Sequence, residues 1–213
     1  MATPQANQPT RFAILASGRG SNADALMQGF ASGYLQANLV AVVSDRPDAP
    51  VLQKATVRGY ATAVVPSGKK TREAHENELL ELLAAHKIEH LLLAGYMRLL
   101  SPHFLDRFAG AILNIHPALL PDFRGMHAAR RQWEAKATVV GATVHFVDAG
   151  VDTGPILLQG SIDVRGDEDC DRLAQRILTE VEHAIYPRAV RLFLERAARA
   201  ANDDPPKTRE TSP

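Results

Sequence analysis

The sequence predicts an α/β fold, in which a mainly parallel, twisted sheet carries helices on both faces. In the first half of the chain, short apolar runs alternate with amphipathic helical patterns, which is typical of parallel strands joined by helical crossovers. After Pro117, two long strand patterns are joined only by a loop at 148–154. We therefore expect a Rossmann-like sheet with an antiparallel portion in its C-terminal half.

Apolar periodicity and turn residues place the expected elements in chain order. Runs rich in β-branched residues and leucine predict strands at 11–16, 39–43, 61–65, 90–94, 111–116, 139–147 and 156–162. Apolar positions and turn signals predict helices at 22–30, 50–57, 71–86, 101–108 and 126–136. Residues 167–199 predict one long helix, or two helices broken at Tyr186-Pro187, because proline removes a helical hydrogen bond.

Length and composition predict a single soluble domain at 11–201. The ends at 1–10 and 202–213 are rich in polar residues and proline, and they predict disordered tails. Basic and acidic residues balance at 24 each, so we expect neither a nucleic-acid nor a membrane partner. No signal peptide or membrane-spanning stretch is evident, and the single cysteine, Cys170, fits a reducing cytoplasm.

The glycine-rich turn after the first predicted strand is a candidate anion site. Gly18 and Gly20 allow a tight turn, and Ser21 and Asn22 are expected to cap the following helix. Exposed amides and the helix dipole then attract a phosphate group. The spacing also satisfies G-x-G-x-x-A, with Asp45 after the next strand, so a dinucleotide site and a plain turn stay open as alternatives.

Asn114 and His116 stand two positions apart at the end of a predicted strand, so their side chains point to one face. Histidine exchanges protons near neutral pH, and an amide beside it can donate to a developing oxyanion. A nearby carboxylate would favour the charged imidazole, and spacing alone does not choose between Asp148 and Asp152. The alternative is a buried histidine next to an asparagine that caps a turn.

The segment after the fourth predicted strand is a candidate pocket for a flat heteroaromatic ligand. Arg98 stands there among the adaptable apolar residues Met97, Leu99 and Leu100. Such a stripe also occurs in ordinary cores. Arg72 ends a basic run that suits an acidic ligand tail, or that simply begins a solvated helix.

Taken together, these segments resemble the folate-dependent formyltransferases from about Arg11 to Arg199. The pattern Asn-x-His-Pro-Ser/Ala-Leu-Leu-Pro is specific for that superfamily. The Gly-x-Gly-Ser-Asn turn and the Glu-His-x-x-Tyr-Pro segment narrow the match to enzymes that formylate glycinamide ribonucleotide. The matching stretches lie at 13–22, 93–102, 113–121, 144–147, 151–155 and 182–187.

The resemblance implies a role for each candidate residue. It implies that Asn114, His116 and Asp152 form the catalytic trio, which favours Asp152 over Asp148 as the partner of the histidine. The substrate-binding residues that it implies are Gly20, Ser21, Asn22 and Glu182, and the folate-binding residues are Arg72, Met97, Arg98, Leu99 and Leu100, with the backbone around 147–152.

The reaction that the resemblance implies is formyl transfer from 10-formyltetrahydrofolate, a co-substrate, to the amine of glycinamide ribonucleotide in purine biosynthesis. No metal is expected, and the partners are small molecules that bind a cytoplasmic monomer or homodimer. A formyltetrahydrofolate hydrolase and a non-catalytic nucleotide-binding module are the alternatives. The chain departs from the family pattern at Asp122 and Arg124, where a basic residue and a proline are expected, so the substrate contacts of that loop stay open.

Overall fold

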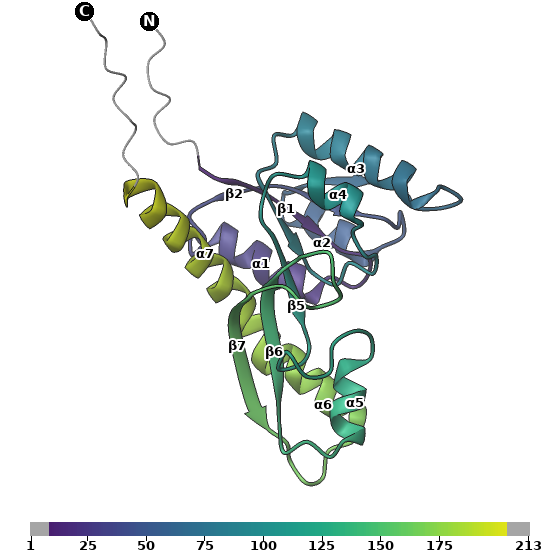
Figure 1. The fold of residues 1–213 in the computed structure, drawn as a ribbon, viewed down its shortest axis with the longest axis vertical. Coiled ribbons are helices and arrows are strands. Elements are labelled where there is room, and N and C mark those ends of the chain that lie inside the picture. The colour runs from purple at the N-terminus through teal and green to yellow at the C-terminus, as the bar shows by residue number, and fades with distance from the viewer. Residues whose placement is uncertain (1–8, 204–213) are drawn as a thin grey trace, which may run out of the picture.

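Seven strands form one mixed sheet, namely β1 (Arg11–Leu15), β2 (Asn38–Ser44), β3 (Ala61–Val64), β4 (His90–Leu93), β5 (Ile112–His116), β6 (Val139–Phe146) and β7 (Ile156–Asp163). Their order is β3-β2-β1-β4-β5-β6-β7 (Figure 1). The strands from β1 to β5 pair in parallel, whereas β6 pairs antiparallel with both β5 and β7. The predicted α/β class and its antiparallel C-terminal portion are confirmed.

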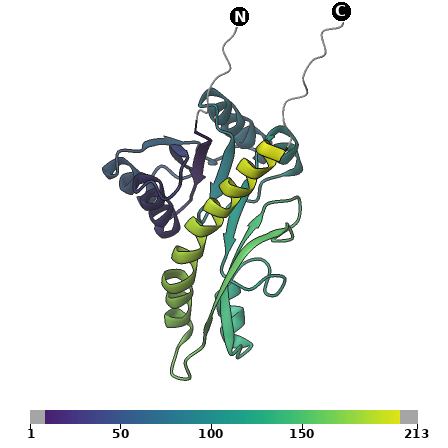
Figure 2. The same ribbon diagram turned by 90° about the vertical axis from the view of Figure 1, so that its left-hand side faces the viewer.

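Helices cover both faces of this sheet. They are α1 (Ser21–Ala31), α2 (Pro50–Val57), α3 (Arg72–Ala85), α4 (Pro102–Arg107), α5 (Ala128–Glu134), α6 (Cys170–Arg176) and α7 (His183–Asp203), with a π-helical turn, η1 (Ile177–Glu182), between the last two. One core contains residues of α1, α2 and α7, and the other contains residues of α3 and α4. Figure 2 shows α7, in green and yellow, running along the length of the molecule.

The computed structural model describes residues 9–203. The tails predicted at 1–10 and 202–213 lie almost entirely outside the described residues, so they stay predictions.

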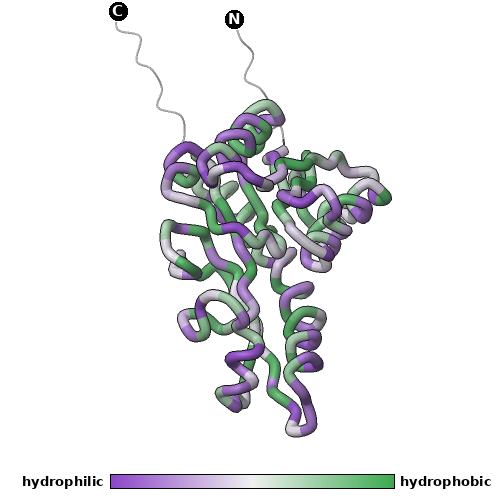
Figure 3. Tube along the Cα trace, turned by 90° about the vertical axis from the view of Figure 1, so that its right-hand side faces the viewer, coloured by the Kyte–Doolittle hydropathy of each residue, from purple (hydrophilic) through white to green (hydrophobic). Residues whose placement is uncertain are grey.

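The alternation of side chains along β1 separates the two cores. Phe12 and Ile14 pack with α1 and α7, whereas Ala13 and Leu15 pack with α3 and α4. All four residues are fully buried, as expected for a parallel strand covered on both faces. Figure 3 shows hydrophobic segments, in green, inside the molecule and hydrophilic segments, in purple, mostly on its outside.

The C-terminal helical region differs from its prediction at Tyr186-Pro187. Pro187 lies inside α7, and the irregularity is the π-helical turn η1, which ends at Glu182. Of the two alternatives predicted for 167–199, the break at Tyr186-Pro187 is therefore wrong, whereas α6, η1 and α7 follow one another as one long helical stretch. Pro187 has no amide proton to donate to the carbonyl of His183, so one helical hydrogen bond is missing. This bond would lie at the junction between the π turn and α7, where the hydrogen-bond pattern changes in any case, and the chain therefore continues as a helix.

Tyr186 fastens α7 to the centre of the sheet. Its side chain is fully buried, and its hydroxyl lies 3.0 Å from both the Leu93 and the Leu113 carbonyl oxygens. These carbonyls stand at the end of β4 and one residue before Asn114 in β5. The tyrosine therefore links the C-terminal helix to the two strand ends that carry the predicted site.

Replacing Tyr186 with phenylalanine should lower the free energy of unfolding by about 1–3 kcal/mol, because two buried carbonyls lose their donor. Denaturant unfolding measures the change. Tyr34→Phe is the control, since Tyr34 is 40% exposed and its contact with Arg191 lies at the surface. We expect a change below about 0.5 kcal/mol there. Equal losses in the two variants would contradict the role given to Tyr186.

Candidate active site

The strand order reverses between β1 and β4, and ligands of open α/β sheets bind beyond the strand ends at such a point. Two loops follow these strands and are bonded to each other. Ser17 donates its amide to Gly95 O at 3.0 Å, and its hydroxyl accepts from the Met97 amide at 2.9 Å. The predicted phosphate turn and the predicted folate loop are therefore neighbours.

Gly20 shapes the predicted phosphate turn. It adopts the left-handed conformation with φ 69°, and it is the N-cap of α1, of which Ser21 is the first residue. The prediction that Ser21 and Asn22 cap this helix is therefore wrong. A Cβ at Gly20 would lie 2.3 Å from Val51 Cγ2, so no other residue fits without displacement of α2. Because glycine has no side chain to occupy the first amides of α1, this helix end is suited to an anion.

Asn22 and Glu182 form a buried polar pair beside that helix end. The Asn22 amide nitrogen donates to Glu182 Oε2 at 2.6 Å, although 160 positions separate the two residues. Burial raises the pKa of Glu182, and the bond from Asn22 only partly opposes this effect. Within the described residues, the buried Oδ1 of Asn22 has no hydrogen-bond partner. A ligand with hydroxyl groups would satisfy such a pair.

Asp152 stands at the centre of the predicted catalytic trio. Its Oδ2 lies 3.2 Å from His116 Nδ1 and accepts from the Gly125 amide at 2.8 Å. Burial alone would raise the pKa of Asp152, but the bonds from His145 and Gly125 and the charge of His116 together hold it below its usual value. The carboxylate is therefore ionised at neutral pH.

Asp148, the competing carboxylate, forms a local turn instead. Its Oδ1 accepts from the Gly150 amide at 3.1 Å and from the Thr153 hydroxyl at 2.7 Å. These are the contacts of a turn residue. The geometry thus places Asp152, and not Asp148, against the imidazole of His116.

His145 is a site residue that the sequence reasoning missed. It lies directly opposite Asn114 in the β5–β6 ladder, and its Nε2 lies 3.2 Å from Asn114 Nδ2 and 3.4 Å from Asp152 Oδ1. Its Nδ1 lies 2.8 Å from the Phe146 carbonyl, an acceptor, so Nδ1 carries a proton. The other nitrogen then accepts from Asn114 in the neutral ring and donates to Asp152 in the charged ring.

A signal for His145 is present in the sequence. Thr143 and His145 repeat, on the next strand, the two-residue spacing of Asn114 and His116. The antiparallel register pairs His116 with Thr143, and Asn114 with His145. Sequence spacing does not give that register, so the signal becomes readable only with the strand pairing.

The loop after β5 folds over His116. Its ring Nε2 lies 2.9 Å from the Phe123 carbonyl, while Nδ1 faces Asp152. Burial lowers the pKa of His116, and His145 and Arg131 act in the same direction, whereas the Phe123 carbonyl and Asp152 oppose them. A neutral ring donates to one of the two acceptors and an imidazolium donates to both, so protonation changes the contacts of this loop.

The unusual side chains of that loop do not make its contacts with the trio. Phe123 contacts His116 through its carbonyl, and Gly125 contacts Asp152 through its amide. Asp122 and Arg124 are exposed. The departure from the family pattern therefore leaves these main-chain contacts in place.

The predicted folate residues gather around the loop after β4. Met97 and Leu99 are 76% and 60% exposed, and Arg98 and Leu100 are partly buried. The guanidinium of Arg72 donates to the Leu99 carbonyl at 2.7 and 3.2 Å, so the structure joins it to this loop. Exposed apolar side chains next to anchored backbone are the surface that a flat ligand covers.

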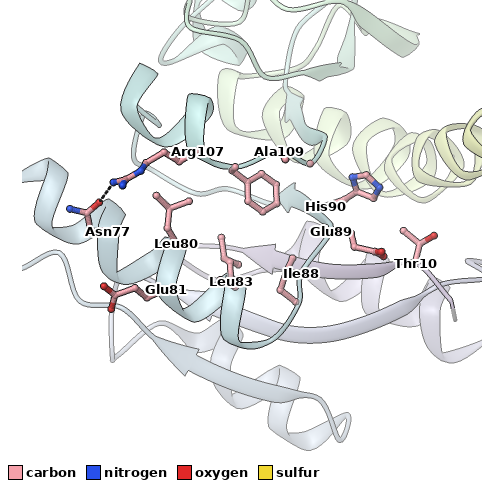
Figure 4. Close-up of a pocket in the computed structure, with 13 residues that line it drawn as sticks. Thr10, Asn77, Leu80, Glu81, Leu83, Ile88, Glu89, His90, Arg107 and Ala109 are labelled. Carbon is pink, nitrogen blue, oxygen red and sulfur yellow. Dashed lines mark hydrogen bonds between the residues drawn. The ribbon is translucent and has the colours of Figure 1, made fainter. Parts of the chain in front are cut away.

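A surface groove of about 990 Å³ lies at the opposite end of the strands, between α3 and α4 (Figure 4). It is lined by residues such as Leu80, Leu83 and Phe108, and Arg107 donates there to Asn77 at 3.2 Å. None of the predicted site residues lines it. The size of a groove therefore does not locate the candidate site in this protein.

Residues 9–203 hold no group of three or more histidine, cysteine or acidic side chains arranged to bind a metal ion. None of the described helices is both long and apolar enough to cross a membrane.

Comparison with known proteins identifies the family. A family model described as formyl transferase matches residues 10–190. Phosphoribosylglycinamide formyltransferase of Bacillus subtilis is 37% identical over 86% of this chain and 94% of its own length. The trifunctional purine biosynthetic protein adenosine-3 of Drosophila melanogaster is 40% identical over 88% of this chain, which spans 14% of that larger protein.

Solved structures agree with the sequence comparison. Glycinamide ribonucleotide transformylase 1 of Symbiobacterium toebii superposes with a TM-score of 0.84 at 42% identity, covering 88% of each chain. Phosphoribosylglycinamide formyltransferase of Brucella melitensis superposes with a TM-score of 0.82 at 41% identity, covering 87% of this chain and 96% of its own. The chain therefore belongs to the formyl transferase family and, within it, to the phosphoribosylglycinamide formyltransferases.

Proposed function

We propose that the protein transfers the formyl group of 10-formyltetrahydrofolate to the amine of 5-phosphoribosylglycinamide, in de novo purine biosynthesis. The observation that carries this proposal is the contact between Asp152 and His116. His116 lies two residues after Asn114 on strand β5. The names of the relatives support the choice of substrates. The products are the N-formyl ribonucleotide and tetrahydrofolate.

The ribonucleotide would bind along the start of α1. The amides that follow Gly20 suit its phosphate, and Glu182 and Asn22 suit the hydroxyl groups of its sugar. The unpartnered oxygen of Asn22 supports this assignment, because a sugar hydroxyl can donate to it. Ser21, the first residue of the helix, lies next to the phosphate in this arrangement.

The formyl donor would bind against the loop after β4. Its heteroaromatic ring suits the surface formed by Met97, Arg98, Leu99 and Leu100, together with the backbone at 147–152. Arg72 is the candidate for its acidic tail. In the free protein, that guanidinium already holds the Leu99 carbonyl, so a tail would share Arg72 with the loop.

The trio would act on the formyl carbon. The neutral amine attacks this carbon and the carbonyl oxygen gains negative charge. Asn114 and protonated His116 donate to that oxygen, and Nε2 of His116 exchanges the Phe123 carbonyl for it while Nδ1 keeps Asp152. Because burial lowers the pKa of His116, its protonated form is a stronger donor than a free imidazolium. As the bond to N10 of the folate breaks, the proton lost by the amine reaches N10 through water beside Asp152.

His145 would position the two ends of this arrangement. Its Nε2 lies within reach of both Asn114 and Asp152, and it orients one of them at a time, by accepting from Asn114 or by donating to Asp152. The assignment requires no metal and no covalent intermediate. A cytoplasmic location and a monomeric or homodimeric state stay predictions.

Asp152→Asn tests the mechanism, with Asp148→Asn as the matched control. We expect kcat to fall by about 10²- to 10⁴-fold in Asp152→Asn, since the amide cannot stabilise the imidazolium. Asp148→Asn should keep kcat within about threefold, because Asp148 serves a turn. The assay follows tetrahydrofolate formation spectrophotometrically, with and without the ribonucleotide, and circular dichroism checks the fold.

Each outcome of that assay has one meaning. Product that appears only with the ribonucleotide supports transfer, whereas equal turnover without it would indicate the hydrolase. Ligand binding without any turnover would indicate a non-catalytic module. Near wild-type activity of Asp152→Asn would remove Asp152 from the trio.

The free energy of unfolding of Glu182→Gln, relative to that of wild type, should increase as the pH rises. Burial raises the pKa of Glu182 above its unfolded value of 4.5, so its stabilising contribution is present below that value and is lost as pH rises through the folded pKa. Glutamine does not titrate and still accepts from Asn22. Denaturant unfolding at pH 4 and pH 8 measures the difference, and the KM for the ribonucleotide should increase.

Glu180→Gln is the control for that pH dependence, because Glu180 lies on the same π-helical turn with the opposite shift. Its bonds with Arg176 hold its pKa below the usual value, so the variant should become less stable relative to wild type as pH rises. Equal pH trends in the two variants would rule out a buried ionised Glu182.

A further inference from the structure

The first turns of α3 bury two polar side chains where apolar ones are expected. His75 and Glu76 are each 2% exposed, and they continue the buried face formed by Leu79 and Leu83. A buried carboxylate or imidazole destabilises a fold unless it is hydrogen-bonded. The hydrogen-bond partners of His75 and Glu76 therefore indicate which role these two buried polar side chains serve.

Both side chains bond to the loop that precedes α4. Glu76 accepts from the Ser101 amide at 2.8 Å and from the Ser101 hydroxyl. His75 Nε2 lies 2.9 Å from the Tyr96 hydroxyl. Tyr96 and Ser101 bracket the four residues from Met97 to Leu100, so α3 holds both ends of the segment.

The middle of the segment is held as well. Arg72, one turn before Glu76 on the same helix, donates to the Leu99 carbonyl, and the Met97 amide donates to Ser17. With its backbone fixed in this way, the segment keeps the side chains of Met97 and Leu99 mostly exposed. Buried polar anchors thus support an exposed apolar surface, which is unfavourable unless a ligand covers it.

The imidazole of His75 can accept a hydrogen bond from the Tyr96 hydroxyl. Burial lowers the pKa of His75, and Arg98 and Lys70 act in the same direction, whereas the Pro66 carbonyl and Asp45 oppose them. When the neutral ring carries its proton on Nδ1, which is buried and has no hydrogen-bond partner within the described residues, Nε2 is free to accept. Tyr96 then donates to it, and burial, which raises the pKa of Tyr96, keeps that hydroxyl protonated.

We propose that His75, acting through Tyr96, is a positioning residue that holds Met97–Leu100 in place to bind the heteroaromatic formyl donor. It touches neither the trio nor the start of α1 in the contacts described above. It therefore supports recognition of the donor and not recognition of the ribonucleotide. This inference rests on the proposed function, since it assigns the donor to this loop.

The test compares His75→Phe, Tyr96→Phe and the double variant. Each single variant should raise the KM for 10-formyltetrahydrofolate by about three- to tenfold, the effect of one hydrogen bond. The KM for the ribonucleotide and kcat at saturating donor should stay within about twofold. The double variant should match the single ones, because both remove the same bond.

His103→Phe is the matched control. His103 also bonds α3, through Asn77 Oδ1 at 2.9 Å, but it lies on α4 beyond the loop. It should change the free energy of unfolding without changing the KM for the donor. Tyr96→Phe removes a single oxygen, so it keeps the test decisive if His75→Phe does not fold.

The outcomes separate this inference from the proposed function. If wild type forms tetrahydrofolate but the variants keep its KM for the donor, or if both KM values rise together, the positioning role is wrong. If wild type binds no folate by titration calorimetry and gives no turnover, the proposed function itself fails. A selective rise in the KM for the donor, with additivity lost in the double variant, supports the role.

Discussion

The carboxylate of Asp152 is the contact on which the candidate site depends. It joins the imidazole of His116 on β5, the imidazole of His145 on β6 and the amide of Gly125 in the intervening loop. Asp152 itself adopts a left-handed conformation with φ 53°, which is unfavourable for a residue other than glycine. The hydrogen bonds and charges around the carboxylate stabilise Asp152 in that conformation. Removing the carboxylate would therefore remove its contacts with β5, with β6 and with the loop between them at once.

The sheet supplies the geometry that this contact uses. The change from parallel to antiparallel pairing at β5 places β6 beside it, so that His145 meets Asn114 directly. The reversal of strand order between β1 and β4 places the glycine turn next to the predicted folate loop. In the proposed function, the buried polar pairs at Glu182 and His75 hold ligand-binding groups in position at a cost in stability.

Much of this arrangement could be predicted from local sequence, and the remainder depends on distant contacts. Periodicity and turn residues predict the strands and most helices, because those patterns act over a few residues. The π-helical turn before α7 and the cap at Gly20 were mispredicted, since packing against neighbouring elements decides them. The Asn22–Glu182 pair spans 160 positions, and His145 becomes significant only through strand register.

Titration of the His116 ring by proton–nitrogen NMR, in wild type and in Asp152→Asn, tests most directly whether this carboxylate stabilises the charged imidazole. We expect a pKa below the usual 6.5 in wild type, because burial outweighs the two acceptors. In Asp152→Asn the pKa should fall further, since the negative charge that favours protonation is gone. An unchanged or higher pKa in the variant would contradict the central place given to Asp152.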